Sequence, residues 1–290
     1  MKIAVIGANG QLGFDLVRTF REHGLQVIEL NQPEIDVTEF EPLAQKLAAA
    51  APDVVVNTAA FHNVELCETE REKSFAVNAL GAANLARSAA ELGFRLAHIS
   101  TDYVFGGEKH TPYLEEDAPL PLNVYANSKL AGEYFVRALA PDHWILRVSG
   151  IYGVSPCLAK GYSFVDLMVK LAGERDKVRV VTDERLTPTP TREIARQIAL
   201  MLEKGAPAGI YHVSAEGDCS WYEFAAEIFK TIRSNVKLEA AEPGEFAVKF
   251  QRPKYSVLEN GKLKKLGLNR MAHWREGLHE YLEEKHPALF

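Results

Sequence analysis

The chain has 290 residues, of which 47% are hydrophobic and 25% charged, with a net charge of −6. This composition supplies a large core and excludes disordered, collagen-like and small disulfide-rich classes. The acidic balance gives no sign of a surface for nucleic acid or anionic membranes. The longest uncharged stretch, residues 74–86, is too short to span a bilayer. Neither a signal peptide nor a metal motif is recognisable, so we expect a cytoplasmic protein without a metal site. It has three separated cysteines: Cys67, Cys157 and Cys219.

In the first half of the chain, short apolar strands alternate with helices. Continuous apolar runs indicate strands that are buried on both faces, which is typical of a parallel sheet covered by helices. The alternation predicts a Rossmann-type, doubly wound α/β sheet. The predicted strands are 2–7, 25–30, 53–57, 95–101 and 143–149, and the predicted helices are 11–23, 40–50 and 68–92.

After about residue 150 the pattern becomes less regular. We expect residues 1–150 to form the nucleotide-binding domain and residues 151–290 a smaller mixed α/β region that binds substrate, with an approximate boundary and interleaving left open. Ser220 and Glu223 predict a capping box at the start of a helix. The other predicted elements here are helices at 164–172, 191–204 and 274–284 and strands at 178–182 and 210–213.

A glycine-rich turn, Gly7-Ala-Asn-Gly10-Gln-Leu-Gly13, lies directly between the first predicted strand and the first predicted helix. Glycines at such a turn let the backbone approach a pyrophosphate, which the free N–H groups and dipole of the helix start then stabilise. The spacing is GxxGxxG rather than the GxGxxG that is usual in dinucleotide-binding folds. A turn without a ligand is the alternative, but its place in an α/β pattern favours a dinucleotide.

Tyr125 and Lys129 are spaced so that they share one face of a helix. A lysine ammonium stabilises a phenolate and thereby lowers the pKa of a tyrosine from its usual value of about 10. Such a tyrosine can donate a proton to a forming alkoxide, and the lysine can hold a ribose hydroxyl. On its own, the same spacing also fits two residues on an exposed helix face.

The segment Ser100-Thr101-Asp102-Tyr103-Val104-Phe105 stands at the end of the fourth predicted strand. Open α/β sheets bind their ligands at the carboxyl ends of strands. A hydroxyl from Thr101 or Ser100 is therefore placed to bind a substrate oxygen beside Tyr125. The alternative is a strand end that uses serine and threonine as turn formers.

The order of these segments resembles the extended short-chain dehydrogenase/reductases and, among them, the family of dTDP-4-dehydrorhamnose reductases. The resemblance covers essentially the whole chain, and STDYVF followed by YxxxK is its most specific part. The matching segments are GANGQLG, NTAAFHNVELCE, FAVNALGAANLA, STDYVFGG, YANSK, RVSGIYG, DERLTPTPTREIA and RPKYSVLENGKLKKLG.

The resemblance implies a catalytic set of Thr101, Tyr125 and Lys129. Thr101 and Asp102 would face the sugar nucleotide. The cofactor would be bound by Tyr125 and Lys129 together with residues that follow the first three strands or lie on the long helix: Gly7, Gly10, Gln11, Leu12, Gly13, Asp36, Val37, Ala60, Phe61, His62 and Asn78.

The implied activity is NAD(P)H-dependent reduction of a 4-keto sugar nucleotide, dTDP-4-dehydro-L-rhamnose to dTDP-L-rhamnose. Gly150, which we assign to the substrate site, stands where these reductases commonly carry a tryptophan, so the identity of the sugar stays open. Arg252 is placed either to bind the substrate diphosphate or to be solvated. A regulatory subunit resembling the beta subunit of methionine adenosyltransferase, and a sugar-nucleotide epimerase or dehydratase, are the alternatives.

The end of the second predicted strand bears on the choice of cofactor. Asn31-Gln32-Pro33 offers no arginine or lysine to bind a 2′-phosphate, and no carboxylate stands at the strand tip. We therefore expect both NADPH and NADH to be used. The expected partner is a nucleotide-sugar substrate, a homodimer is an open option, and neither nucleic acid nor a membrane is expected.

Overall fold

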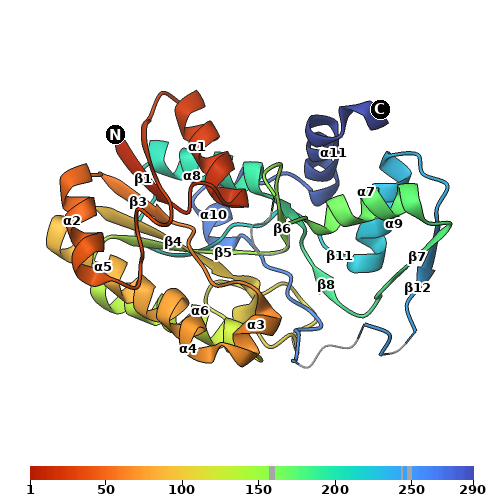
Figure 1. Ribbon diagram of the computed structural model, residues 1–290, viewed down its shortest axis with the longest axis horizontal. Helices are drawn as coiled ribbons and strands as arrows, with labels where there is room; N and C mark the ends of the chain where they lie inside the picture. Colours follow the sequence, from red (N-terminus) through yellow and green to blue (C-terminus); the bar gives the residue numbers. More distant parts are fainter. Residues whose placement is uncertain (157–160, 243, 247–249) are drawn as a thin grey trace.

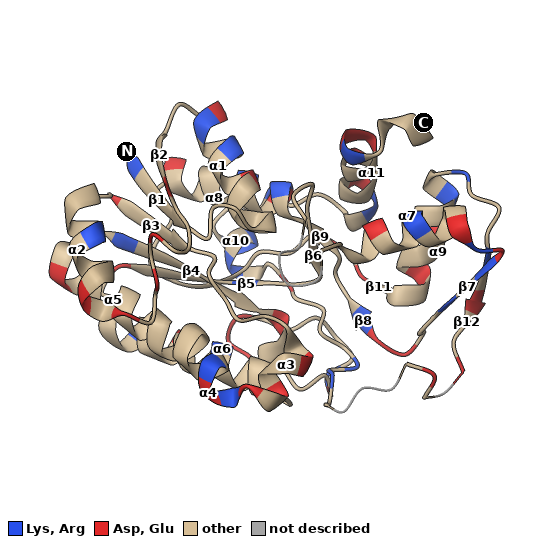
Figure 2. Ribbon diagram, in the orientation of Figure 1, with Lys and Arg blue, Asp and Glu red and all other residues tan. Residues whose placement is uncertain are grey.

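The computed structural model describes residues 1–156, 161–242, 244–246 and 250–290 (Figure 1). Cys67 and Cys219 are buried free thiols, and Cys157 lies outside the described residues. Acidic and basic residues are interspersed over the helices (Figure 2). Within the described residues, none of the helices is both long enough and apolar enough to cross a membrane.

A six-stranded parallel sheet forms the centre of the larger part of the molecule. Its strands are β10 (Gly209–His212), β5 (His143–Val148), β4 (Arg95–Thr101), β3 (Val54–Asn57), β1 (Lys2–Ile6) and β2 (Gln26–Leu30), in that spatial order. β3 and nearly all of β1 are buried, as their continuous apolar runs predict, and β4 is buried as well except at Arg95. This arrangement confirms the doubly wound α/β fold.

Helices cover both faces of this sheet, as Figure 1 shows. Ile3 and Val5 of β1 pack into one layer, whereas Ala4 and Ile6 pack into the other, because successive side chains of a strand point to opposite faces. The first layer contains α1 (Gln11–Glu22), α8 (Thr191–Glu203) and α10 (Gly261–Lys265); the second contains α2 (Phe40–Ala50), α5 (Gly81–Leu92) and α6 (Val124–Leu139).

The long helix that the sequence predicts over 68–92 is interrupted at Glu70 and contains a π-helical turn. The structure has α3 (Val64–Thr69), α4 (Arg71–Phe75), a π-helical turn (Ala76–Leu80) and then α5. A Cβ on Gly81 would lie 2.6 Å from a side-chain methyl of Val37, so this stretch packs too closely against the segment after β2 for a larger residue. The predicted end at Gly93 is confirmed.

A smaller region packs around a second, aromatic-rich core that includes Tyr152, Phe224 and Trp274. Its helices are α7 (Phe164–Glu174), α9 (Trp221–Thr231) and α11 (Trp274–Lys285), and the predicted capping box of Ser220 and Glu223 is present. Short strand pairs complete it: β7 (Lys177–Val180) with β12 (Lys237–Ala240), β8 (Arg185–Leu186) with β11 (Cys219–Ser220), and β6 (Ile151–Tyr152) with β9 (Thr189–Pro190).

The two parts are interleaved along the chain. β10 joins the central sheet beside β5, and Ile194 and Ile198 of α8 share a hydrophobic core with Leu16 of α1. Both elements come from beyond residue 150. The chain therefore leaves the sheet after β5, builds part of the smaller region and returns to the sheet.

Candidate active site

The glycine turn between β1 and α1 brings two backbone segments into close contact. A Cβ on Gly13 would lie 2.0 Å from the carbonyl oxygen of Gly7 and 2.7 Å from the Cα of Ala8. Neither backbone atom can yield by a side-chain rotation, so only glycine fits at position 13. The first turn of α1 is consequently held directly over the end of β1.

The start of α1 fits a phosphate group. Gly10 is the N-cap residue and supplies no capping side chain, and the first turn contains no acidic residue. The side-chain Nε2 of Gln11 is buried without a hydrogen-bond partner among the described residues. The side chain of Leu12 belongs to the core, so only its backbone faces the turn. Free N–H groups and a positive helix end are what a pyrophosphate needs.

The segment after β2 is held by its own contacts. Asp36 accepts hydrogen bonds from the backbone N–H and the hydroxyl of Thr38, and Val37 is buried with its carbonyl accepting from Asn84 of α5. These contacts fix the backbone of a segment that the family resemblance assigns to cofactor binding. That Asp36 and Val37 contact the cofactor stays a prediction.

Asn78 holds the loop after β3 from inside the π-helical turn. Its side-chain oxygen accepts from the N–H of Phe61 at 2.8 Å, and its Nδ2 donates to the Phe61 carbonyl at 2.9 Å. The same Nδ2 donates to the hydroxyl of Ser128, next to Lys129. Asn78 thus fixes the loop that contains Ala60, Phe61 and His62, all partly buried or exposed, and links this loop to α6.

Tyr125 and Thr101 meet where α6 begins beside the end of β4. Asn123 caps α6 by accepting from the N–H of Ala126, which places Tyr125 in the first turn of the helix. The hydroxyl of Thr101 lies close enough to the phenol of Tyr125 to lower the pKa of that tyrosine against the effect of burial. The ring of Tyr103 packs edge-on against Tyr125, with centroids 6.1 Å apart. The structure therefore brings this predicted pair together.

Lys129 lies one turn further along α6 and is directed at the sheet. Its Nζ donates to the carbonyl of Ile99 at 2.7 Å, and burial lowers its pKa to about 8, with Glu133 opposing this shift. Burial raises the pKa of Tyr125, the Thr101 hydrogen bond opposes the rise, and the Asp102 charge adds to it. The expected lowering of the tyrosine pKa by Lys129 is wrong for this structure, since the ammonium is bonded elsewhere.

A buried ion pair lies beneath the end of β4. Arg147 and Glu133 form two hydrogen bonds, of 2.9 and 2.7 Å, and the side chains of both are only 2% exposed. The hydroxyl of Ser100 donates to the same carboxylate at 2.6 Å. The hydrogen of Ser100 is therefore committed to Glu133, and the hydroxyl of Thr101 donates to Asp102 at 3.1 Å, so of these two it is Thr101 that lies beside Tyr125.

An open cavity of about 650 Å³ lies between residues 106–108 near the sheet and segments of the smaller region. Arg252 borders it with 34% of its side chain exposed, and its Nη1 is 3.7 Å from Glu184. Gly150 does not line this cavity: a Cβ there would meet Leu186 at 2.7 Å and the Thr187 carbonyl at 3.1 Å. The assignment of Gly150 to the substrate site therefore gains no support from the cavity.

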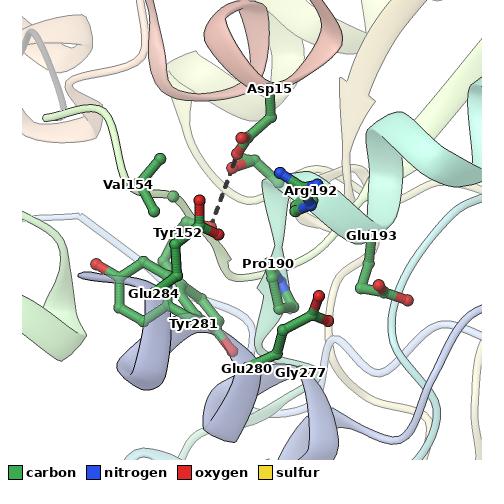
Figure 3. A pocket seen from close by; sticks show the side chains of 12 residues that line it. Asp15, Tyr152, Val154, Pro190, Arg192, Glu193, Gly277, Glu280, Tyr281 and Glu284 are labelled. Carbon is green, nitrogen blue, oxygen red and sulfur yellow. Dashed lines mark hydrogen bonds between the residues drawn. The ribbon is translucent and has the colours of Figure 1, made fainter. Parts of the chain in front are cut away.

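A second cavity, of about 10 Å³, lies between α1, α8 and α11 (Figure 3). Asp15 there accepts a hydrogen bond of 2.5 Å from Thr191, and burial raises the pKa of Asp15. A volume of this size holds about one water molecule. It is far too small for a sugar nucleotide.

Comparison with known proteins shows the family. A profile described as the RmlD substrate binding domain matches residues 1–286. The chain belongs to this RmlD family. It is 38% identical to the spore coat polysaccharide biosynthesis protein SpsK of Bacillus subtilis over 99% of each chain. The structure resembles a dTDP-4-dehydrorhamnose reductase of Clostridium acetobutylicum (TM-score 0.92, 36% identity, 98% and 99% coverage) and that of Bacillus anthracis in complex with NADP (0.92, 34%, 98% and 99%).

Sequence analysis of this RmlD family member did not identify several polar residues around Thr101 and Tyr125. Two of them carry a signal in the sequence that could have been used. Arg147 is a charged residue inside a mainly apolar strand, and Glu133 lies one turn after Lys129 on α6. Ser128 lies within the YANSK motif. Nothing in the sequence marks Ser149 and Ser256, whose roles depend on contacts between distant segments.

Proposed function

We propose that this RmlD family member is an NADPH-dependent reductase of a 4-keto sugar nucleotide that converts dTDP-4-dehydro-L-rhamnose to dTDP-L-rhamnose. The observation that supports it best is the contact between the hydroxyls of Thr101 and Tyr125 at the carboxyl end of β4, with Lys129 one helical turn away. The names of the similar reductases support the same activity.

The backbone of Gly10, Gln11 and Leu12 would hold the cofactor pyrophosphate, because this helix start is uncapped. Bound NADPH supplies the hydride. The complex of the Bacillus anthracis protein with NADP supports NADPH. Asn31, Gln32 and Pro33 after β2 contain no basic side chain, so we expect NADH to be accepted as well.

The side chains at the end of β4 would supply the proton for the reduction. Burial raises the pKa of Tyr125, so its hydroxyl carries a proton at neutral pH and can donate it to the carbonyl oxygen as that oxygen gains charge. Lys129 would hold a ribose hydroxyl. The nucleotide end of the substrate would occupy the cavity beside Arg252.

The decisive assay mixes purified protein, NADPH and dTDP-4-dehydro-L-rhamnose and follows the loss of NADPH absorbance. Tyr125→Phe should lower kcat by about 10²–10⁴-fold, because it removes the general acid. Tyr134→Phe is the matched control, since Tyr134 lies on the same helix and is 53% exposed. Full activity of Tyr125→Phe would contradict the proposed proton donor.

The alternatives give different outcomes in the same preparation. Cofactor binding without reduction of any sugar nucleotide would favour a regulatory subunit. Tightly bound NAD in the absorbance spectrum of the purified protein would favour an epimerase or dehydratase. A homodimer and a cytoplasmic location stay predictions.

A further inference from the structure

Asp102 is a buried carboxylate beside Thr101 that the proton transfer described above does not use. It begins a short 3₁₀ turn (Asp102–Val104) after β4 and is 4% exposed. Three hydroxyls converge on it: Thr101 donates at 3.1 Å, Ser149 at 2.8 Å and Ser256 at 2.6 Å. These residues come from the end of β4, the residue after β5 and the C-terminal segment, so one carboxylate joins three separate parts of the chain.

The direction of these hydrogen bonds follows from their chemistry. An ionised carboxylate can only accept, and each hydroxyl has one hydrogen to donate. While Asp102 is ionised, the hydrogen of Thr101 is therefore committed to it. The oxygen of Thr101 is left to accept, which it does from the backbone N–H of Tyr103 at 3.2 Å, and the same hydroxyl lies close enough to the phenol of Tyr125 to affect the pKa of that tyrosine.

We propose that Asp102 is a positioning residue for the reduction, which fixes the Thr101 hydroxyl as an acceptor toward Tyr125 and holds the C-terminal segment against the catalytic strand through Ser256. The role in catalysis rests on the proposed function. When Tyr125 gives its proton to the substrate oxygen, the Thr101 hydrogen can turn from Asp102 to the phenolate oxygen. Asp102 then keeps two donors, Ser149 and Ser256, and no proton leaves Thr101.

This arrangement depends on the charge of Asp102. Burial raises its pKa to about 6, against the effect of the three hydroxyl donors. The titratable groups that face Asp102 are Tyr103 and Tyr125. Two more distant charges act on Tyr103: Arg252 lowers the pKa of this tyrosine and Glu184 raises it. Protonation makes Asp102 a donor itself, so the Thr101 hydroxyl loses its fixed direction. Activity should therefore fall on the acid side.

The test is the pH profile of kcat for the wild type and four variants. Wild-type kcat should fall about tenfold per pH unit below about 6. Asp102→Asn should lack this fall and have a kcat about 10–100-fold lower at neutral pH, with KM nearly unchanged, because a misoriented group lowers the rate of the chemical step. Ser256→Ala and Ser149→Ala should each move the fall to higher pH by about one unit, since each removes a donor that stabilises the charged form.

Ser88→Ala is the matched control. Ser88 is a fully buried serine of α5 that donates only to the carbonyl of Asn84 among the described residues, so its loss should leave the acid limb in place. An acid limb that persists in Asp102→Asn, or an Asp102→Asn variant that raises KM alone, would overturn the proposal. If circular dichroism shows that Asp102→Asn does not fold, the two serine variants provide the test. An acid-side fall of kcat that stays at the wild-type pH in both Ser256→Ala and Ser149→Ala would then overturn the proposal.

A measurement without substrate separates this inference from the proposed function. In a carboxyl-carbon NMR titration, Thr101→Val should raise the pKa of Asp102 above its wild-type value, because it removes one donor to the charged form. An unchanged pKa would overturn the assigned hydrogen bond whether or not the protein reduces a sugar nucleotide. Absence of NADPH oxidation by the wild type would overturn the proposed function alone.

Discussion

Lys129 donates a hydrogen bond of 2.7 Å to the carbonyl of Ile99, across the contact between α6 and β4. This bond directs the only ammonium of the YxxxK motif at the sheet and not at Tyr125. The lysine is only 3% exposed, and burial disfavours its charged form. The pKa of Lys129, about 8, makes this cost measurable.

Stability at alkaline pH should reveal this buried charge. The folded-state pKa of Lys129 lies below the unfolded value of 10.5, so the unfolded state binds more protons between about pH 8 and 10.5. The contribution of Lys129 to stability is therefore present above the unfolded pKa and is lost as pH falls through about 8. Chemical denaturation of the wild type and Lys129→Met should show the wild type gaining roughly 2–4 kcal/mol relative to the variant across this window. A constant difference would mean that Lys129 titrates normally.

Gly13→Ala should disrupt the turn before α1. Its Cβ would lie 2.0 Å from the Gly7 carbonyl oxygen, so β1 and α1 must separate. We expect a loss of about 1–3 kcal/mol in the free energy of unfolding, as for other overpacked sites. Affinity for NADPH should fall by at least about tenfold, measured by fluorescence titration.

Gly173→Ala is the control for this substitution. Gly173 is an exposed residue of α7, and nothing lies within 4 Å of the Cβ that it would gain. Replacing an interior helix glycine by alanine should stabilise the protein by about 0.5–1 kcal/mol and leave NADPH binding unchanged. Unchanged NADPH affinity in Gly13→Ala would show that the cofactor does not require the close approach of the turn.

Local patterns were sufficient to predict the elements of the sheet. β4 is found at the predicted residues, 95–101, where a short segment rich in buried residues lies between the C-cap glycine Gly93 and a turn. Tyr125 and Lys129 are assigned from their spacing only in combination with the STDYVF segment and the family resemblance. The interruption of the predicted 68–92 helix at Glu70 and the π-helical turn over Ala76–Leu80 could not be predicted, because local periodicity does not encode them.

Contacts between distant segments account for what the sequence did not predict at the site. Asp102 and Ser256 are 154 residues apart, and no periodicity connects them. Glu133 and Arg147 are residue types that usually lie at the surface. Here both are buried, because each neutralises and hydrogen-bonds the other. The direction in which Lys129 points likewise depends on the carbonyl of Ile99, which a motif cannot specify.

Gly150→Trp should not create an aromatic surface for the sugar. Gly150 has a φ of +53°, and its Cβ would lie 2.7 Å from Leu186 and 3.2 Å from the Cα of Pro188. The backbone strain and the overpacking should together lower the free energy of unfolding by roughly 2–4 kcal/mol. Gly205→Ala, with a φ of +62° and nothing within 4 Å of its Cβ, separates the two effects and should lose only about 1–2 kcal/mol. Equal losses would mean that the segment around Leu186 yields to a side chain.

Arg252→Ala should weaken binding of the substrate and not of the cofactor. Arg252 borders the large cavity, its nearest carboxylate is 3.7 Å away at Glu184, and a third of its side chain is exposed, so its guanidinium has N–H groups left for a diphosphate. A charge-assisted hydrogen bond contributes about 1.5–3 kcal/mol, so KM for the sugar nucleotide should rise by roughly 10–100-fold.

Isothermal titration of the Arg252→Ala variant with each ligand separately measures this division between the two sites. Cofactor affinity should change by less than about twofold, because the pyrophosphate of NADPH would bind at Gly10, which does not line the cavity beside Arg252. Arg87→Ala is the charge-matched control: Arg87 is an exposed residue of α5 paired with Glu91, and it does not line the cavity. Equal losses for both ligands, or no loss for the sugar nucleotide, would show that Arg252 does not bind the substrate diphosphate.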